Sequence, residues 1–415
     1  MSSADELLPH LMRRLEEVRR TLGWVDALPA DGRIAFADVI DSMGLVEFLS
    51  LLADDCGTTA EALERATGRR FGTVADLAET LARAGIRPTA PAARPVIETT
   101  ADRSAKAWLS AMTYRLPATV QTAAQLNDRL QRPPGWLEAR AGIVQRRLWG
   151  EEDALTATAA NAADALRYSG ATAAQVGALL VTAEAPPLPV GLAAEMHRRL
   201  GLPAHAVALE IGGACTGFLA ALWTGLRLFP TQDIVLLIAV EAPSQWLETA
   251  PGPAGEAAAL FGDATAACVL SREPIGPRAL PLREVSLGVD PAGAQLVQVE
   301  RSASGRPELA MDGPPLASWA VQALARIITE MTDRHEVESQ ELAGVVIHGG
   351  NGRLPGLLAR RLRLPEERVL SETARTGNLG SASLPVAWTV RAPGPGPIVW
   401  AAVGAGGLWG AALTG

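Results

Sequence analysis

One cysteine occupies a position at which a thiol nucleophile would be useful. Cys215 follows the apolar run 206–211 and precedes a helical pattern that starts near residue 217, so we expect it at a strand-to-helix junction. The field of a helix N-terminus favours thiolate over thiol, which would prepare Cys215 to attack a carbonyl carbon. A buried structural cysteine is the alternative interpretation, and we expect it for Cys56 and Cys268.

A nucleophilic cysteine needs polar partners, and one His and one Asn stand at suitable places. His348 ends an apolar run that begins at Gly344, so its imidazole should emerge at the edge of a sheet. Asn378 lies in a loop bounded by glycines before a helical pattern, although a turn role alone would explain it. The other histidines are expected on the surface: His10, His197, His205 and His335.

A serine in the N-terminal region is a third candidate. Ser42 follows Asp41 at the start of a helix whose apolar residues recur every three or four positions. Asp and Ser at a helix start cap free backbone N–H groups, and capping needs no further role. The surrounding sequence favours a role for Ser42 beyond capping, because residues 31–64 hold eight acids and one Arg and therefore give this helix a negative face.

The elements that position these residues belong to two parts of the chain with different hydrophobic patterns. Residues 1–86 predict a small all-α bundle, and residues 87–105 are rich in Pro, Ala and Thr without an apolar period, which indicates an extended linker. Residues 106–415 alternate apolar runs with amphipathic stretches, which predicts an α/β domain with buried sheets. The order of elements permits a duplication of about 106–275 and 280–415. The expected strands are 176–182, 206–211, 234–240, 266–270, 344–348 and 398–403, and the expected helices are 154–168, 192–200 and 319–330.

Composition excludes several classes of function. The net charge of −8 argues against nucleic-acid binding, and residues 1–86 carry most of the excess with nine Arg against fifteen Asp or Glu. Three widely spaced cysteines fit neither a zinc site nor a disulfide framework, so we expect no metal and a reducing, cytoplasmic location. The N-terminus lacks the features of a signal peptide. The uncharged stretch 392–415 is long enough for a membrane helix, but its prolines and glycines predict strand, turn and strand.

The N-terminal part resembles an acyl or peptidyl carrier protein. The sequence Asp41-Ser42-Met43 with Val46-Glu47-Phe48 stands where that family has Asp-Ser-Leu and Val-Glu-Leu, and the match spans nearly all of residues 5–85. The resemblance implies that Ser42 accepts a 4′-phosphopantetheine arm from a phosphopantetheinyl transferase. It also implies that the acids after Ser42 dock on basic enzyme surfaces. A carrier that is never modified is the alternative.

The larger part resembles the thiolase-fold condensing enzymes, most closely those of the ketoacyl synthase III type. Six landmarks carry the resemblance in the family's order: 136–143, Gly213-Ala-Cys-Thr-Gly-Phe218, Phe261-Gly-Asp-Ala264, His348 to Arg353, Gly377-Asn378, and 404–410. The family implies a five-layered αβαβα core and a homodimer.

The resemblance also implies roles for individual residues. Cys215 would hold an acyl group, and the backbone N–H groups of Cys215 and Gly406 would form an oxyanion hole. His348 and Asn378 would donate hydrogen bonds to the oxygen of a malonyl-type thioester as it loses carbon dioxide. The residues implied to contact coenzyme A or a carrier phosphate are Trp136, Arg140 and Arg353, for which an ordinary packed aromatic and solvated arginines are equally good explanations.

Two departures from the family's pattern bear on substrate preference. The family has Gln-Ala after its His, whereas this chain has Gly349-Gly350, and Ala405 interrupts the glycine-rich run near the C-terminus.

These residues and resemblances are compatible with three functions. The first is a fused carrier and condensing enzyme that performs decarboxylative Claisen condensation in specialised acyl or polyketide biosynthesis, on acyl-CoA or acyl-carrier substrates. A linker of 19 residues would reach roughly 60 Å, which allows delivery in cis or to a dimer mate. The second is an acyltransferase that moves the acyl group from Cys215 to a hydroxyl or amine. The third is a non-catalytic carrier and docking scaffold.

Overall fold

The computed structural model divides into two compact units. One comprises residues 1–99 with 312–322, and the other comprises residues 100–311 with 323–415. The residues it describes are 3–21, 28, 32–40, 42–58, 63, 65–66, 72–88, 106–187, 191–229, 231–301, 307–311, 313–391 and 393–415. Most of the expected linker at 87–105 lies outside the described residues, so the linker stays a prediction.

The smaller unit is helical over its described residues. Its helices are α1 (Ser3–Thr21), α2 (Phe36–Val39), α3 (Ser42–Asp55) and α5 (Val74–Arg83), and the start of α12 (Gly313–Arg334) is grouped with it. Apolar residues of these helices, including Leu11, Leu15, Phe48 and Leu77, form one buried core. The N-terminus of α5 is fixed by a capping box, in which the side chains of Thr73 and Asp76 each accept from the other's backbone N–H.

An acidic anchor joins α1 to α3 in this unit. Asp55 accepts from the guanidinium of Arg14 at 2.6 and 2.7 Å and lies 2.8 Å from Nε2 of His10. Burial alone would raise the pKa of Asp55, but the hydrogen bonds from Arg14 and His10 outweigh it and lower the pKa. The contact therefore fixes the end of α3 against α1.

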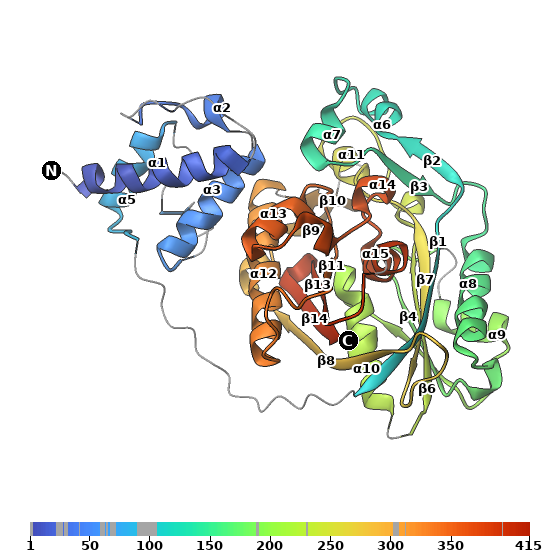
Figure 1. Cartoon of the computed structure of the whole chain (residues 1–415). Helices are drawn as coiled ribbons and strands as arrows, with labels where there is room; N and C mark the ends of the chain where they lie inside the picture. The colour runs from blue at the N-terminus through green and yellow to red at the C-terminus, as the bar shows by residue number, and fades with distance from the viewer. Residues whose placement is uncertain are drawn as a thin grey trace. The chain divides into compact units, whose positions relative to one another are not determined.

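A ten-stranded mixed sheet organises the larger unit (Figure 1). Its order is β12-β11-β13-β14-β8-β1-β7-β6-β4-β5. The strands are β1 (Ala107–Arg115), β4 (Ala178–Thr182), β5 (Val207–Ile211), β6 (Ile234–Glu241), β7 (Ala264–Ser271), β8 (Leu280–Val289), β11 (Gly344–Ile347), β12 (Val369–Leu370), β13 (Ile398–Gly404) and β14 (Leu408–Thr414).

The sheet consists of two halves with the same topology. From the middle outward the first half runs β1-β7-β6-β4-β5, and the second runs β8-β14-β13-β11-β12. In both halves the outer three strands are parallel and the inner pairings are antiparallel. The duplication that the sequence permitted is thus present. The halves join through a short antiparallel pairing of β1 with β8, from Ala107↔Leu282 to Leu109↔Leu280, so they form one sheet.

Helices fill the space between the half-sheets and cover their outer faces, giving the expected five layers (Figure 1). Buried residues of α10 and α15, such as Phe218 and Leu384, share one core with strands of both halves. On the first half, Leu166 of α8 and Met196 of α9 belong to a second core with β4 and β6. The helices in question are α8 (Ala154–Ser169), α9 (Leu192–Leu200), α10 (Gly217–Leu228) and α15 (Ser383–Arg391), with α12 (Gly313–Arg334) and α13 (Leu354–Leu362) beside the second half.

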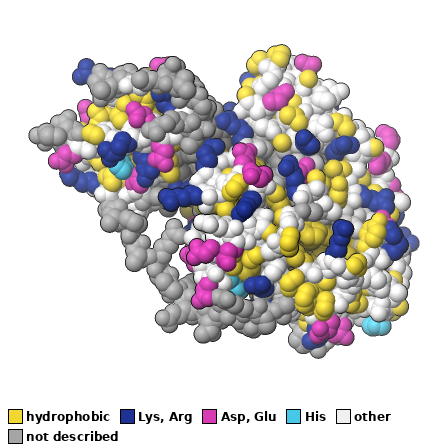
Figure 2. Space-filling model, viewed as in Figure 1, with side chains coloured by type: hydrophobic (Ala, Val, Ile, Leu, Met, Phe, Trp, Pro, Cys, Tyr) yellow, Lys and Arg dark blue, Asp and Glu magenta, His cyan; other side chains and the backbone are white. Residues whose placement is uncertain are grey.

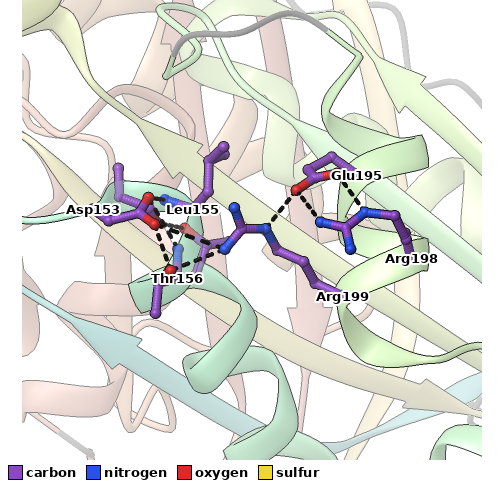
Figure 3. Close-up of polar contacts among 8 residues, drawn as sticks. Asp153, Leu155, Thr156, Glu195, Arg198 and Arg199 are labelled. Carbon is purple, nitrogen blue, oxygen red and sulfur yellow. Dashed lines mark hydrogen bonds and ion pairs between the residues drawn. The ribbon is translucent and has the colours of Figure 1, made fainter.

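Polar contacts join the two outer helices of the first half (Figure 3). Asp153 caps α8 by accepting from the backbone N–H groups of Leu155 and Thr156. Arg199 of α9 donates to Oγ1 of Thr156 at 2.9 Å and to Oε1 of Glu195 at 2.6 Å. Exposed pairs of this kind contribute only about 0–1 kcal/mol each, so their role is chiefly to orient the helices over β4.

The remaining described elements lie around this core. They are β2 (Thr119–Thr122), β3 (Gln145–Leu148), α6 (Ala123–Arg129), α7 (Trp136–Ala141), α11 (Pro253–Ala258), β9 (Val297–Arg301), β10 (Pro307–Met311) and α14 (Thr373–Thr376). Basic, acidic and apolar side chains are interspersed over the face of this unit that Figure 2 shows.

Two sequence expectations are decided by this unit. The uncharged C-terminal stretch forms the antiparallel pair β13 and β14, as predicted, and none of the described helices is long and apolar enough to cross a bilayer. The expectation for His335 was wrong. That residue is 3% exposed, and its Nε2 contacts Oε2 of Glu284 at 2.7 Å, because it faces strand β8 rather than solvent.

Candidate active site

The chain turns sharply where β5 ends and presents Cys215. Gly213 and Ala214 both have positive φ, +134° and +48°, and a 3-10 turn over Ala214–Thr216 leads directly into α10. A positive φ is uncommon for a residue other than Gly and stores strain that the surroundings must hold. Thr216 supplies part of that support, since its N–H and its hydroxyl both donate to the carbonyl of Gly213. Cys215 is 8% exposed.

Three segments pack closely together at this turn: the start of α10, the end of β4 and the residues after Asn378. A Cβ on Gly217 would lie 2.1 Å from Oγ1 of Thr182 and 3.2 Å from Cβ of Ser381. The first residue of α10 is therefore packed against the end of β4 and against the segment that follows Asn378. Only glycine permits this contact, which brings the Cys215 turn together with residues from both halves of the sheet.

A carboxyl group lies against the sulfur. The Sγ of Cys215 donates to Oε2 of Glu184 at 3.2 Å. Burial raises the pKa of Cys215 well above its usual value, and the charges of Glu184 and Glu241 raise it further. Burial and the neighbouring acids thus oppose the thiolate that the field of the helix N-terminus favours.

A second buried acid, Glu241 at the end of β6, braces the segments around the cysteine. Its carboxyl oxygens accept from the backbone N–H groups of Glu184, Ala185 and Ser381, and from the hydroxyl of Ser381. Burial raises the pKa of Glu241 to about 7, with Glu184 contributing in the same sense and the N–H donors opposing. Glu241 thus connects the Glu184 segment of the first half to the Ser381 segment of the second.

His348 directly follows β11 and is 4% exposed. Its Nδ1 lies 3.0 Å from the hydroxyl of Ser383, and its backbone N–H donates to Ala401 of β13. Burial lowers the pKa of His348 to about 4, so the imidazole is neutral at neutral pH. A neutral ring with Nδ1 engaged can offer Nε2 to a substrate.

Asn378 is held by its own backbone and by its side-chain oxygen. Its N–H donates to Leu260, its carbonyl accepts from Gly262, and its Oδ1 accepts from the N–H of Gly380 at 2.9 Å. A Cβ built on Gly350 would lie 3.8 Å from Nδ2 of Asn378 and 3.6 Å from Nε2 of His348. The two side-chain nitrogens therefore border one position next to Gly350, as the predicted pairing requires.

Packing explains why residue 349 is glycine where the family has Gln. A Cβ on Gly349 would lie 2.5 Å from Oγ of Ser371 and 3.1 Å from Oγ1 of Thr373. Thr373 also donates its hydroxyl to the carbonyl of Gly349. These hydroxyls occupy the room that a larger residue would need.

The glycine-rich run near the C-terminus passes the cysteine at Gly404. A Cβ on Gly404 would lie 3.2 Å from the backbone N of Cys215, whereas a Cβ on Gly406 would meet nothing within 4 Å. Gly406 has φ +79°, a conformation suited to glycine. The participation of the N–H groups of Cys215 and Gly406 in an oxyanion hole stays a prediction.

The three residues expected to contact coenzyme A or a carrier lie together on the surface. The guanidinium of Arg140 lies 5.6 Å from the centre of the Trp136 ring, and that of Arg132 lies 5.3 Å from it. Arg353, which precedes α13, donates to the carbonyl of Ala139 in α7. An aromatic ring flanked by arginines can bind a base and phosphates.

Sequence reasoning missed Glu184 and Glu241. Glu184 lies two residues after β4, and His348 lies one residue after β11, the strand that corresponds to β4 in the second half. Had the duplication been used as a guide, the position of His348 would have pointed to the residues after β4. Glu241 carried no such signal, because it ends an ordinary buried strand.

Ser42 is the first residue of α3 in the smaller unit. Its side chain and Asp41 lie outside the described residues, so the predicted attachment of a prosthetic arm stays a prediction.

Comparison with known proteins gives the family. Residues 209–301 match 3-Oxoacyl-[acyl-carrier-protein (ACP)] synthase III, and residues 332–415 match the C-terminal part of the same enzyme. Beta-ketoacyl-[acyl-carrier-protein] synthase III 3 of Streptomyces coelicolor is 32% identical over 323 residues, which cover 72% of this chain and 93% of that protein. The synthase III of Acaryochloris marina is 27% identical over 299 residues, which cover 67% and 88% respectively.

Solved structures agree with this result. The crystal structure of 3-oxoacyl-(acyl carrier protein) synthase III from Pseudomonas aeruginosa is similar with a TM-score of 0.66 and 28% identity, over 74% of this chain and 97% of that one. Xanthomonas campestris OleA shares the fold, with a TM-score of 0.68 and 18% identity over 77% and 99%. This chain therefore belongs to the β-ketoacyl-[acyl-carrier-protein] synthase III family of condensing transferases.

Proposed function

We propose that this enzyme joins an acyl group held on Cys215 to a malonyl-type thioester by decarboxylative Claisen condensation. The observation that carries the proposal is the segment 378–383, around which Cys215, His348 and Asn378 meet. This segment contacts the Cys215 turn, its Ser383 hydroxyl is hydrogen-bonded with Nδ1 of His348, and its Gly380 N–H donates to Oδ1 of Asn378.

The acylation step uses the sulfur alone as nucleophile. Sγ of Cys215 attacks the carbonyl carbon of an acyl thioester, the bond from that carbon to the departing sulfur breaks, and the leaving thiol takes up a proton. The product is an acyl group bound to Cys215, which divides one difficult transfer into two easier ones.

The condensation step uses the neutral donors. Nε2 of His348 and Nδ2 of Asn378 donate to the thioester oxygen of the extender while its carboxylate leaves as carbon dioxide. The electron pair of the broken bond becomes an enolate, whose carbon attacks the acyl carbonyl on Cys215 and releases the sulfur. Donors aimed at a developing oxyanion contribute roughly 3–4 kcal/mol each, and a neutral imidazole supplies one without needing a proton source.

Intact-protein mass spectrometry tests both steps. With an acyl-CoA alone, the wild-type protein should gain one acyl mass, Cys215→Ala should gain none, and Cys268→Ala should behave as wild type, since Cys268 lies in the middle of β7. Malonyl-CoA should then discharge the acyl group with release of carbon dioxide. Transfer of the acyl group to a hydroxyl or amine without carbon dioxide would replace condensation by the acyltransferase function, and a wild-type protein that is never acylated would favour a scaffold.

We further propose that the smaller unit is a carrier modified with 4′-phosphopantetheine on Ser42. Supporting this are its helical core, its acidic composition and the position of Ser42 at the start of α3. A phosphopantetheinyl transferase should add one phosphopantetheinyl mass to the wild type and to Ser50→Ala, another serine of the same helix, but none to Ser42→Ala. An unmodified wild type would contradict the carrier assignment.

A homodimer, finally, is supported by the exposed edge of the sheet. Among the residues that the structure describes, strand β5 pairs only with β4, and it exposes Val207 and Leu209 by 37% and 39%. An apolar edge strand is a template for pairing with a second copy of itself. Leu209→Lys should convert a dimer into a monomer in light scattering, and an equally monomeric wild type would exclude the proposal.

A further inference from the structure

The contact between Glu184 and Cys215 is not explained by the roles already given. Condensation as proposed needs the sulfur, an imidazole and an amide, whereas the structure places a carboxyl oxygen 3.2 Å from the sulfur as the acceptor of its proton.

The surroundings of the thiol create a need for a proton acceptor. Cys215 is 8% exposed, and the charged groups that act on it, Glu184 and Glu241, both disfavour a thiolate. His348 is neutral and has its Nδ1 at Ser383. The thiol therefore enters the reaction with its proton, which must leave as the sulfur attacks.

Glu184 is placed to receive that proton. Its backbone N–H donates to both carboxyl oxygens of Glu241, at 3.0 and 3.1 Å, which fixes the segment that carries it. Although Glu184 is exposed as a residue, its carboxyl group lies against the buried sulfur. Desolvation of the carboxyl raises the pKa of Glu184, which makes it a better base than an ordinary carboxylate at neutral pH.

We infer that Glu184 is a catalytic residue, the general base for acylation of Cys215 and the general acid for departure of the thiol. As Sγ bonds to the acyl carbon, its proton passes to Oε2 of Glu184. When the bond from that carbon to the leaving sulfur breaks, the same proton passes to the leaving thiolate. Acyl thioester and enzyme thiol become acyl-enzyme and free thiol, with no net gain or loss of protons. The inference rests on the proposed acylation of Cys215 and adds to it.

The test is the rate of acyl-enzyme formation in a single turnover, followed by mass spectrometry with acetyl-CoA, butyryl-CoA and octanoyl-CoA. Glu184→Gln keeps the shape and can still accept from the thiol but cannot take its proton, and it should slow acylation by about 10²- to 10³-fold. Glu184→Asp, with a carboxylate on a shorter arm, should retain part of the rate. Glu152→Gln makes the same change on an exposed side chain that accepts from Ala118 and should leave the rate unchanged.

A second measurement separates a proton-transfer role from a structural one. Alkylation of Cys215 by iodoacetamide, followed across pH, reports the pKa of its thiol. Glu184→Gln removes the negative charge beside the sulfur and leaves Glu241 as the acid that acts on the thiol. The inflection of the alkylation rate should therefore move to lower pH, while acylation becomes slower. A residue that acted on Cys215 only through its charge would, once neutralised, lower the inflection and speed acylation instead of slowing it.

Different results would exclude the role of Glu184 and the proposed condensation. If wild-type Cys215 is acylated and Glu184→Gln is acylated at the same rate, the role of Glu184 is excluded and the proposed condensation stands. If the wild type is acylated by none of the three thioesters while its thiol is still alkylated, the proposed function fails first.

Discussion

The two halves of the large sheet have one topology and contribute different chemistry. In the first half, the segment after β4 carries Glu184 and the connection from β5 to α10 carries Cys215. In the second, the residue after β11 is His348, and the connection from β12 to α15 carries Asn378. Equivalent strand ends thus place a carboxyl group and a thiol on one side and an imidazole and an amide on the other.

This difference suggests a division of labour. A thiol paired with a carboxyl group is equipped to form and break a thioester by moving one proton. An imidazole with a lowered pKa and an amide are equipped to stabilise an oxyanion without changing their protonation. We therefore assign acylation to the first half and decarboxylation to the second, joined by Glu241, whose carboxyl contacts segments of both.

The largest expected effect comes from the second half. Asn378→Ala and His348→Ala each remove a donor to the enolate oxygen, so release of carbon dioxide from malonyl-CoA should fall by about 10²- to 10³-fold. Acylation of Cys215 should stay within about threefold of wild type, because neither side chain takes the thiol proton in the scheme proposed here. Separate assays of acyl-enzyme formation and carbon dioxide release check the split. If acylation slows as much as decarboxylation, the halves are not divided in this way.

Glu241→Gln should weaken both half-reactions together. Its carboxylate accepts from three backbone N–H groups, whereas an amide has a single oxygen and would point N–H groups at N–H donors. We expect a loss of about 2 kcal/mol in unfolding free energy and a similar fractional loss of acylation and decarboxylation. Urea unfolding and the two assays measure these effects. Glu151→Gln, a change of an exposed acid before α8, serves as the comparison. A change confined to one half-reaction would contradict the bracing role.

Much of the fold followed from short-range patterns. The apolar runs that became β4, β6, β7, β11 and β13 were recognisable because strands buried on both faces consist of consecutive apolar residues. Cys215 and His348 were recognisable for a related reason, since each follows such a run close to glycines, and Asn378 was recognisable because glycines bound its loop.

The remaining site residues depended on long-range packing. Glu184 lies near Cys215 only because β4 and β5 are neighbours and because Gly217 lets α10 approach Thr182. The raised pKa of the thiol depends on the same packing, which no local pattern around Cys215 contains. His335 was misplaced for a similar reason, because Glu284 belongs to a strand about 50 residues away in sequence.

A titration in the second half gives a smaller effect of known sign. The pKa of His348 is about 4 in the folded protein and about 6.5 when unfolded, so the unfolded chain binds more protons between these values. Stability should therefore fall as pH decreases through 6.5 toward 4, by about 2 kcal/mol between pH 7 and pH 5 from this residue alone.

Urea unfolding of wild type and His348→Gln at both pH values measures this contribution. Tryptophan fluorescence reports mainly on the larger unit, which holds eight of the ten tryptophans. The variant should lose about 2 kcal/mol less than the wild type on acidification. Equal losses would mean that folding leaves the pKa of His348 near 6.5, and the lowered pKa would then be excluded.

The smallest changes in stability should come from alanine substitutions of the two glycines after His348, which have no counterpart after β4. Gly349→Ala would bring a methyl group within 2.5 Å of Oγ of Ser371 and force its neighbours apart, at a cost of about 1–2 kcal/mol. Gly350→Ala would place a methyl group at ordinary contact distance from His348 and Asn378, and stability should change by less than about 0.5 kcal/mol. Gly350→Leu would extend into the position that both nitrogens border, so it should block condensation while leaving acylation of Cys215 intact. If Gly350→Leu instead slows acylation and spares condensation, the position beside Gly350 does not hold the extender oxygen, and the assignment of decarboxylation to the second half loses its geometric basis.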